Sequence, residues 1–120
     1  MVSSARTKNT IQKLDVNKQN SGNPATIGTT AFVLYTCPTG KVALVKSFKW
    51  RATGFGAGTE MNARAKSQKI DTTTAVMGSM REAAGNGIRL VAGETIDLIG
   101  DSAANNESAF FDVTVQELPA

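Results

Sequence analysis

Residues 31–52 read AFVLYTCPTGKVALVKSFKWRA, and this stretch decides the fold. Two apolar runs, at residues 32–35 and 42–50, flank a bend that contains Pro38 and Gly40. Proline fixes its own φ and glycine tolerates a positive one, so this pair is typical of a connection between two strands. Beyond the bend, apolar and polar residues alternate, which predicts a strand with one buried face. The predicted buried face holds Val42, Leu44, Phe48 and Trp50.

The body of the chain, residues 31–120, is predicted to be a series of short strands. Lys46 interrupts the apolar face described above, and we expect that strand to reach a rim there. Further alternating stretches follow at 59–66, 88–99 and 109–118, and strands recur about every 8–12 residues. No stretch shows the period of an amphipathic helix. The pattern predicts an all-β fold, an antiparallel β-sandwich or jelly-roll-like domain.

Residues 1–30 differ from the body and are predicted to form an extended N-terminal arm. They are rich in Ser, Thr and Asn and offer few apolar anchors. Ordering a residue costs about 1–2 kcal/mol, which such a segment cannot offset alone, so we expect it to gain shape by docking on a neighbour. The side chains predicted to bind that partner are Arg6, Lys8, Ile11, Lys13, Leu14, Val16 and Lys18.

Three bulky side chains outside the predicted core are candidates for contacts between subunits. Phe55 lies at the tip of a glycine-rich loop, residues 53–58. Phe110 and Leu118 fall on the polar side of the last predicted strand. The opposite side of that strand is predicted to face the core through Phe111, Val113 and Val115.

The composition excludes several classes of site. The chain has no histidine and a single cysteine, Cys37, so the usual catalytic triads and Cys/His zinc sites are ruled out. Cys37 itself is interpreted as a small buried residue. We therefore predict a protein that is not an enzyme and has no cofactor and no metal. No apolar run approaches the ~18 residues of a membrane span, and residues 1–20 show no signal-peptide core, so no membrane contact is expected.

Charge is distributed unevenly along the chain, although its net value is only +3. Residues 1–69 hold eleven basic and two acidic residues, whereas residues 70–120 hold two basic and eight acidic ones. One interpretation is that early and late strands neutralise each other within a sandwich. Another is a polarised subunit whose basic end meets an acidic neighbour or a second copy. Nucleic-acid binding is a weaker alternative, because no aromatic ladder interleaves with the scattered basic residues.

Three short motifs resemble those of small virion proteins of tailed bacteriophages. Residues 34–41, LYTCPTGK, and the strand after them resemble the opening of many such proteins, although Cys37 stands where an aliphatic residue is more common. Residues 90–96, LVAGETI, and 113–118, VTVQEL, resemble their later turn and last strand. The resemblance covers most of the body and leaves the arm outside. It implies a β-sandwich or jelly roll that decorates a capsid or forms part of a tail or fibre.

From this resemblance we expect a capsid decoration, or cement, protein on the outer surface of a phage head. Its expected partners are the major capsid protein and further copies of itself, as a trimer or another closed homo-oligomer. Its expected location is the virion, after assembly in the host cytoplasm. A tail, fibre or adaptor subunit is the alternative of the same class.

Alternatives from other classes rest on few residues. A carbohydrate-binding module would need exposed aromatic side chains, and the only candidates are Tyr35, Trp50 and Phe55. Glycoside chemistry would need paired carboxylates such as Glu94 and Asp97, but these are predicted to lie in a turn and on the solvent side of a strand. A calcium site would draw its oxygen ligands from a loop that lacks the usual spacing, with Asp97, Asp101 and Glu107.

Overall fold

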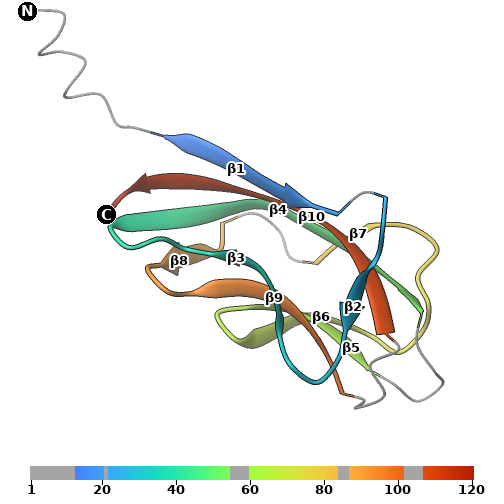
Figure 1. Ribbon diagram of the computed structural model, residues 1–120. Coiled ribbons are helices and arrows are strands. Elements are labelled where there is room, and N and C mark those ends of the chain that lie inside the picture. The colour runs from blue at the N-terminus through green and yellow to red at the C-terminus, as the bar shows by residue number, and fades with distance from the viewer. Residues whose placement is uncertain (1–12, 21, 55–59, 84–86, 102–106) are drawn as a thin grey trace, which may run out of the picture.

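The computed structural model describes residues 13–20, 22–54, 60–83, 87–101 and 107–120, and it shows two antiparallel β-sheets packed face to face (Figure 1). The predicted all-β antiparallel sandwich is confirmed. None of the described residues belongs to a helix that is long and apolar enough to cross a membrane.

The first sheet is built around two long strands that pair with each other, β4 (Lys41–Gly54) and β10 (Glu107–Pro119). The free side of β10 pairs with β1 (Leu14–Gln19) and β2 (Ala25–Ile27). The free side of β4 pairs with β7 (Arg81–Glu82) and β8 (Arg89–Val91).

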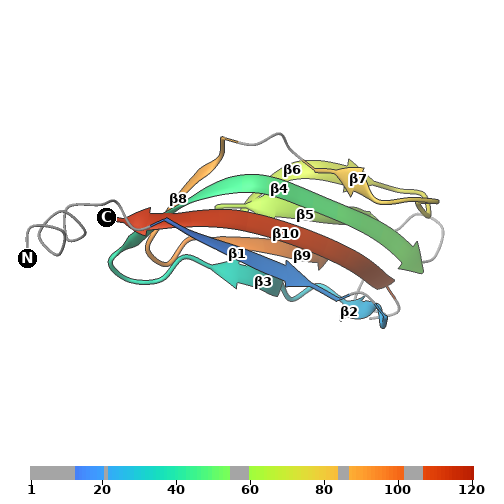
Figure 2. The same ribbon diagram turned by 90° about the horizontal axis from the view of Figure 1, so that it is seen from above.

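The second sheet has the strand order β3 (Phe32–Thr36), β9 (Thr95–Gly100), β5 (Met61–Ala65) and β6 (Gln68–Thr73). Figure 2 shows the edge strands β1 and β3 on one side of the sandwich, and β6 and β7 on the other. The two sheets therefore present neighbouring edges, one from each sheet, along the side that carries β1.

The core lies between the sheets and is continuous. Trp50 and Phe48 of β4 are fully buried in the same cluster as Met61 of the second sheet. The indole N–H of Trp50 donates to Asp71 Oδ2 at 2.8 Å, and the guanidinium of Arg81 pairs with the same carboxylate at 2.9 Å. The indole nitrogen, which is the only polar atom of the Trp50 side chain, therefore has a hydrogen-bond partner at the edge of the sandwich.

The face of β4 that the core covers changes at Lys46. Val45 pairs with Val115 of β10 while Ser47 pairs with Thr114, so Lys46 is an extra residue in a β-bulge, and it is exposed. An extra residue reverses the alternation of a strand, because successive side chains point to opposite faces. The buried residues of β4 are accordingly Ala43 and Val45 before the bulge, and Phe48, Trp50 and Ala52 after it.

Because of this bulge, the predicted buried face is wrong for the first half of β4, whereas the predicted buried face of β10 is confirmed. Val42 and Leu44 were expected to share the buried face with Trp50, but they are half-buried because they precede the bulge and point to the outer face. In β10 the expected inward residues are confirmed as buried, and a glutamate continues their series. They are Phe111, Val113 and Val115, followed by Glu117.

The strands β1 and β2 differ from the extended arm expected over residues 1–30. Both pair with β10, from Leu14 opposite Glu117 to Gln19 opposite Asp112, and again at residues 25–27. Residues 14–19 and 25–27 are therefore part of the body, because a ladder to β10 supplies the order that their apolar content does not. The first twelve residues of the expected arm lie outside the described residues.

We expect deletion of Lys46 to lower the free energy of unfolding by roughly 3 kcal/mol or more. Without the extra residue, one half of β4 must turn its buried side chains toward solvent. The matched variant Lys46→Ala keeps the bulge and should change stability by no more than about 0.5 kcal/mol, because the side chain is exposed. Urea denaturation followed by the fluorescence of Trp50 measures both. Equal stability of the two variants would contradict this register.

Candidate docking site

Polar side chains hold β1 on the first sheet. The side-chain amide of Asn17 donates to Asp112 Oδ1 at 2.6 Å and to Thr114 Oγ1 at 3.0 Å, both on the outer face of β10. On the opposite face of β1, Val16 packs against the core, whereas Leu14 is 57% exposed. Most of the attachment of β1 therefore comes from hydrogen bonds, and little from apolar burial.

Asn20 completes this attachment just beyond the end of β1. Its side-chain amide donates to the carbonyl of Ala109 at 3.0 Å, and its Oδ1 accepts the backbone N–H of Phe111 at 2.8 Å. An asparagine amide offers one donor and one acceptor group, so it can satisfy backbone groups on both sides of a gap in the ladder. The chain then turns into β2, where Ile27 is fully buried.

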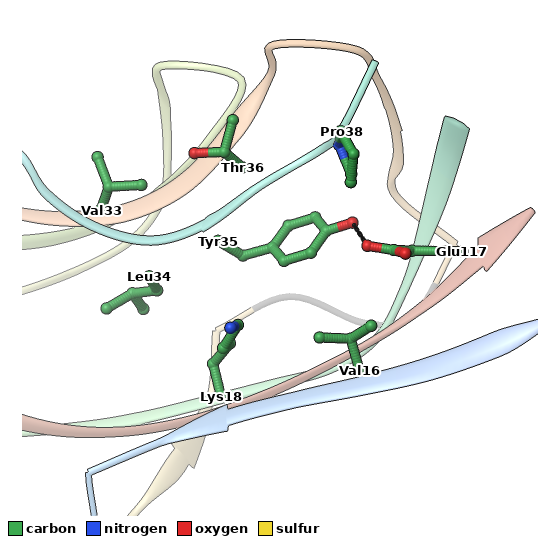
Figure 3. Close-up of a pocket in the computed structure, with 8 residues that line it drawn as sticks. All are labelled: Val16, Lys18, Val33, Leu34, Tyr35, Thr36, Pro38 and Glu117. Carbon is green, nitrogen blue, oxygen red and sulfur yellow. Dashed lines mark hydrogen bonds between the residues drawn. The ribbon is translucent and has the colours of Figure 1, made fainter. Parts of the chain in front are cut away.

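A cleft of about 360 Å³ lies between β1 of the first sheet and β3 of the second (Figure 3). Val16 and Lys18 point into it from β1. Their direction follows from the pairing, since Val16 and Lys18 lie opposite Val115 and Val113, whose side chains are buried between the sheets. The complete lining consists of Val16, Lys18, Val33, Leu34, Tyr35, Thr36, Pro38 and Glu117.

A buried acid forms part of this lining. Glu117 is 7% exposed, and its Oε2 accepts a hydrogen bond from the hydroxyl of Tyr35 at 2.6 Å (Figure 3). No cation among the described residues forms a salt bridge with Glu117. The salt bridges between described residues join other pairs. Those bridges are Arg64–Asp97, Lys69–Glu60 and Arg81–Asp71.

Tyr35, the donor to Glu117, is itself buried, with 4% of its surface exposed. Burial raises the pKa of the Tyr35 phenol far above its ordinary value, and the hydrogen bond to Glu117 and the charge of that group raise it further. The neighbouring thiol of Cys37 is buried too, and burial raises its pKa. Cys37 is thus placed as the small buried residue that the sequence indicated.

The structure brings part of the predicted arm to this cleft. Leu14, Val16 and Lys18 share the side of β1 that faces it, and Lys13 is exposed at the start of the strand. The other predicted arm residues, Arg6, Lys8 and Ile11, lie outside the described residues.

The predicted subunit contacts are placed away from the cleft. Phe110 and Leu118 are half-buried on the outer face of β10, and Arg51 covers the ring of Phe110, with Cζ 5.2 Å from the ring centroid. Leu118 lies in one row with Val42 and Val91, of which Val91 is 45% exposed. Phe55 lies outside the described residues.

The residues considered for glycoside hydrolysis, calcium binding or sugar binding are occupied in other contacts or are buried. Asp97 was expected on the solvent side of its strand, but it is 2% exposed because Arg64 covers it with two hydrogen bonds of 2.7 and 3.0 Å. Glu94 accepts the backbone N–H of Val91 through Oε1 at 2.7 Å, and Asp101 accepts that of Glu60 at 2.8 Å. Two of the aromatic candidates for sugar binding, Tyr35 and Trp50, are buried.

Sequence reasoning missed the cleft and its acid, although one signal was present. Glu117 follows Phe111, Val113 and Val115 at the same two-residue spacing, so the alternation itself places a carboxylate on the core side of the last strand. An acid in such a position needs a donor nearby. The pairing with Tyr35 joins residues 82 positions apart and has no local signature.

Comparison with known proteins assigns no family. No protein-family model and no curated protein matches the sequence. A solved structure of Bacillus endospore appendages, described as a novel family of disulfide-linked pili, is 15% identical with a TM-score of 0.45, over 92% of this chain and 90% of that one. The CBM36-1 domain of a multidomain xylanase from the hindgut metagenome of Trinervitermes trinervoides is 12% identical with a TM-score of 0.35, over 91% and 98%. Both TM-scores are too low for either similarity to bear on function.

The raised pKa of Tyr35 predicts that stability falls in alkali. The phenol of the unfolded chain loses its proton near pH 10, whereas the folded protein retains it. Above about pH 10 the unfolded state therefore binds fewer protons, and the free energy of unfolding decreases as the pH rises. Tyr35 is the only tyrosine, so tyrosinate absorbance reports on it alone. We expect this absorbance to appear only together with unfolding; its appearance in folded protein near pH 10 would contradict the buried pair.

The variant Tyr35→Phe should be less stable at neutral pH by about 1–3 kcal/mol, because the buried carboxylate of Glu117 loses its donor. It should also lose the part of the alkaline decline that belongs to Tyr35. Urea denaturation at neutral and alkaline pH measures both effects. Tyr35→Phe with wild-type stability would show that the hydrogen bond contributes nothing.

Proposed function

We propose that the chain is a structural virion subunit, a capsid decoration protein that binds the outer surface of a phage head. The observation that carries the proposal is the arrangement around β1. The leading segment, residues 1–12, enters the described body at a strand that has a partner on one side only. The segment carries Arg6 and Lys8 and no acidic residue. A rigid sandwich with a free edge and a basic extension is suited to linking neighbouring molecules.

The short motifs of the sequence support the same class of protein. Residues 34–41 and 90–96, which resemble parts of small virion proteins, form the connection before β4 and the turn between β8 and β9. In the turn, Gly93 has a φ of 86°, which explains why a glycine stands there. These motifs therefore shape one end of the sandwich and contain no chemistry of their own.

Attachment to a head would combine several weak contacts. The leading segment would pair its basic side chains with carboxylates of neighbouring molecules, among them the major capsid protein. The half-buried Phe110 and Leu118 on the outer face of the first sheet would supply apolar area. A closed oligomer such as a trimer would present several segments together, and multivalent attachment turns weak single contacts into tight binding.

Deletion of residues 2–12 tests the proposal, because it leaves β1 and the whole described body in place. The full-length protein should saturate undecorated heads of a phage that encodes it. The deletion variant should bind those heads at least roughly tenfold more weakly, since each attachment loses its linking segment. Co-sedimentation of protein with heads measures the occupancy.

The variant Lys66→Gln/Lys69→Gln is the matched control for lost charge. Both lysines are exposed: Lys66 lies in the turn between β5 and β6, and Lys69 lies in β6. The strand β6 is on the side of the sandwich opposite β1. This control should bind heads as the wild type does. Full-length protein that leaves the heads bare at saturating concentration would overturn the proposal.

A further inference from the structure

We propose that the cleft beside β1 receives the leading segment of a second copy of this chain, which adds as a strand to the free edge of β1 and places a basic side chain against Glu117. The inference rests on the proposed function, because it names a partner for the same segment. It differs from that function in the molecule contacted, which is another copy and not the capsid.

The first argument is the edge itself. In the described part of the chain β1 pairs with β10 only, so the backbone groups along its other side have no strand partner. Unpaired N–H and C=O groups along an edge are a template for one more strand. Five of the six residues of β1 are exposed, which leaves that edge accessible.

The second argument is the charge in the cleft. Glu117 is almost completely buried, has one described hydrogen bond, from Tyr35, and has no described cation within salt-bridge distance. A buried charge without a partner is unfavourable, so a cation placed there gains more than it would at an exposed acid. The end of the cleft at Glu117 therefore favours a basic side chain, whereas Lys18 lines the other end.

The third argument is the composition of the leading segment. Arg6 and Lys8 are its only charged residues, and in an extended strand residues two apart point to the same face. In a register that turns this face toward the cleft, both aliphatic stems would cover its apolar lining while one charged end meets Glu117.

The fourth argument is geometric and favours a second copy over the segment's own β1. A return along its own β1 by a two-residue hairpin turn would place Gln12 and Lys13 in that turn, which is disfavoured because such turns require positive φ, for which glycine or asparagine is preferred. Twelve extended residues span about 40 Å, roughly twice the length of the six-residue β1, so the segment can leave one subunit and cover the edge of the next.

Sedimentation of the full-length chain, without heads, tests the inference. The wild type should self-associate reversibly. The variants Arg6→Gln/Lys8→Gln and Glu117→Gln should each shift the association curve to roughly tenfold higher concentration. Because both variants remove the same contact, their combination should weaken association no further than the stronger of the two. Fully additive effects would overturn the inference.

Two controls keep the test independent of folding and of general charge. Asp15→Asn removes an acid from the same strand but from its other face, and Lys66→Gln/Lys69→Gln removes two exposed lysines from the opposite side of the sandwich. Both should associate as the wild type does. If Glu117→Gln fails to fold, Arg6→Gln/Lys8→Gln still decides the question, because its changes lie before the described body.

The outcomes separate this inference from the proposed function. A full-length chain that stays monomeric at every concentration overturns the inference, and if it nonetheless saturates heads, the decoration role stands. A chain that self-associates through Arg6 and Lys8 but leaves heads bare supports the inference and overturns that role. Self-association that persists unchanged in Arg6→Gln/Lys8→Gln places the contact elsewhere, and it also overturns the inference.

Discussion

The pairing of β4 with β10 is the constraint on which the rest of the structure depends. Every other strand of the first sheet pairs with one of these two, and their inward side chains contribute a large part of the core. The bulge at Lys46 lets both halves of β4 stay buried although the alternation is interrupted. With β4 on one side, β10 has a single free edge, and the strands that occupy this edge determine where the cleft lies.

The sandwich was predictable because alternation reports directly on burial in a two-layer fold. It identified the inward residues of β10, Phe111, Val113 and Val115, because the extra residue of the bulge lies in β4 and the alternation of β10 itself is unbroken. It misplaced Val42 and Leu44, because the even-numbered positions are apolar on both sides of Lys46, and the lysine was interpreted as a rim position and not as an extra residue. Only the partner strand decides which residue is extra, and a slip of one residue exchanges the two faces.

The position of β1 was less predictable, because the forces that hold it leave no periodic pattern. Asn17 and Asn20 bond to residues of β10 that lie more than 85 positions away in the chain. A count of apolar anchors therefore underestimated the order of residues 14–19 and 25–27, which backbone ladders and amide groups secure. The same holds for the pair of Tyr35 and Glu117, whose members belong to different sheets.

A charge that points inward is one way in which proteins protect an edge strand, and Lys18 occupies such a position on β1. Glu117 lies four residues along β10 from Val113, the partner of Lys18, which corresponds to about 13 Å. One end of the cleft is thus positive and the other negative. An incoming strand with a basic residue near Lys18 is repelled, whereas one with its basic residues near Glu117 is attracted. The two charges therefore discriminate between registers of an added strand, which is how a free edge can remain selective.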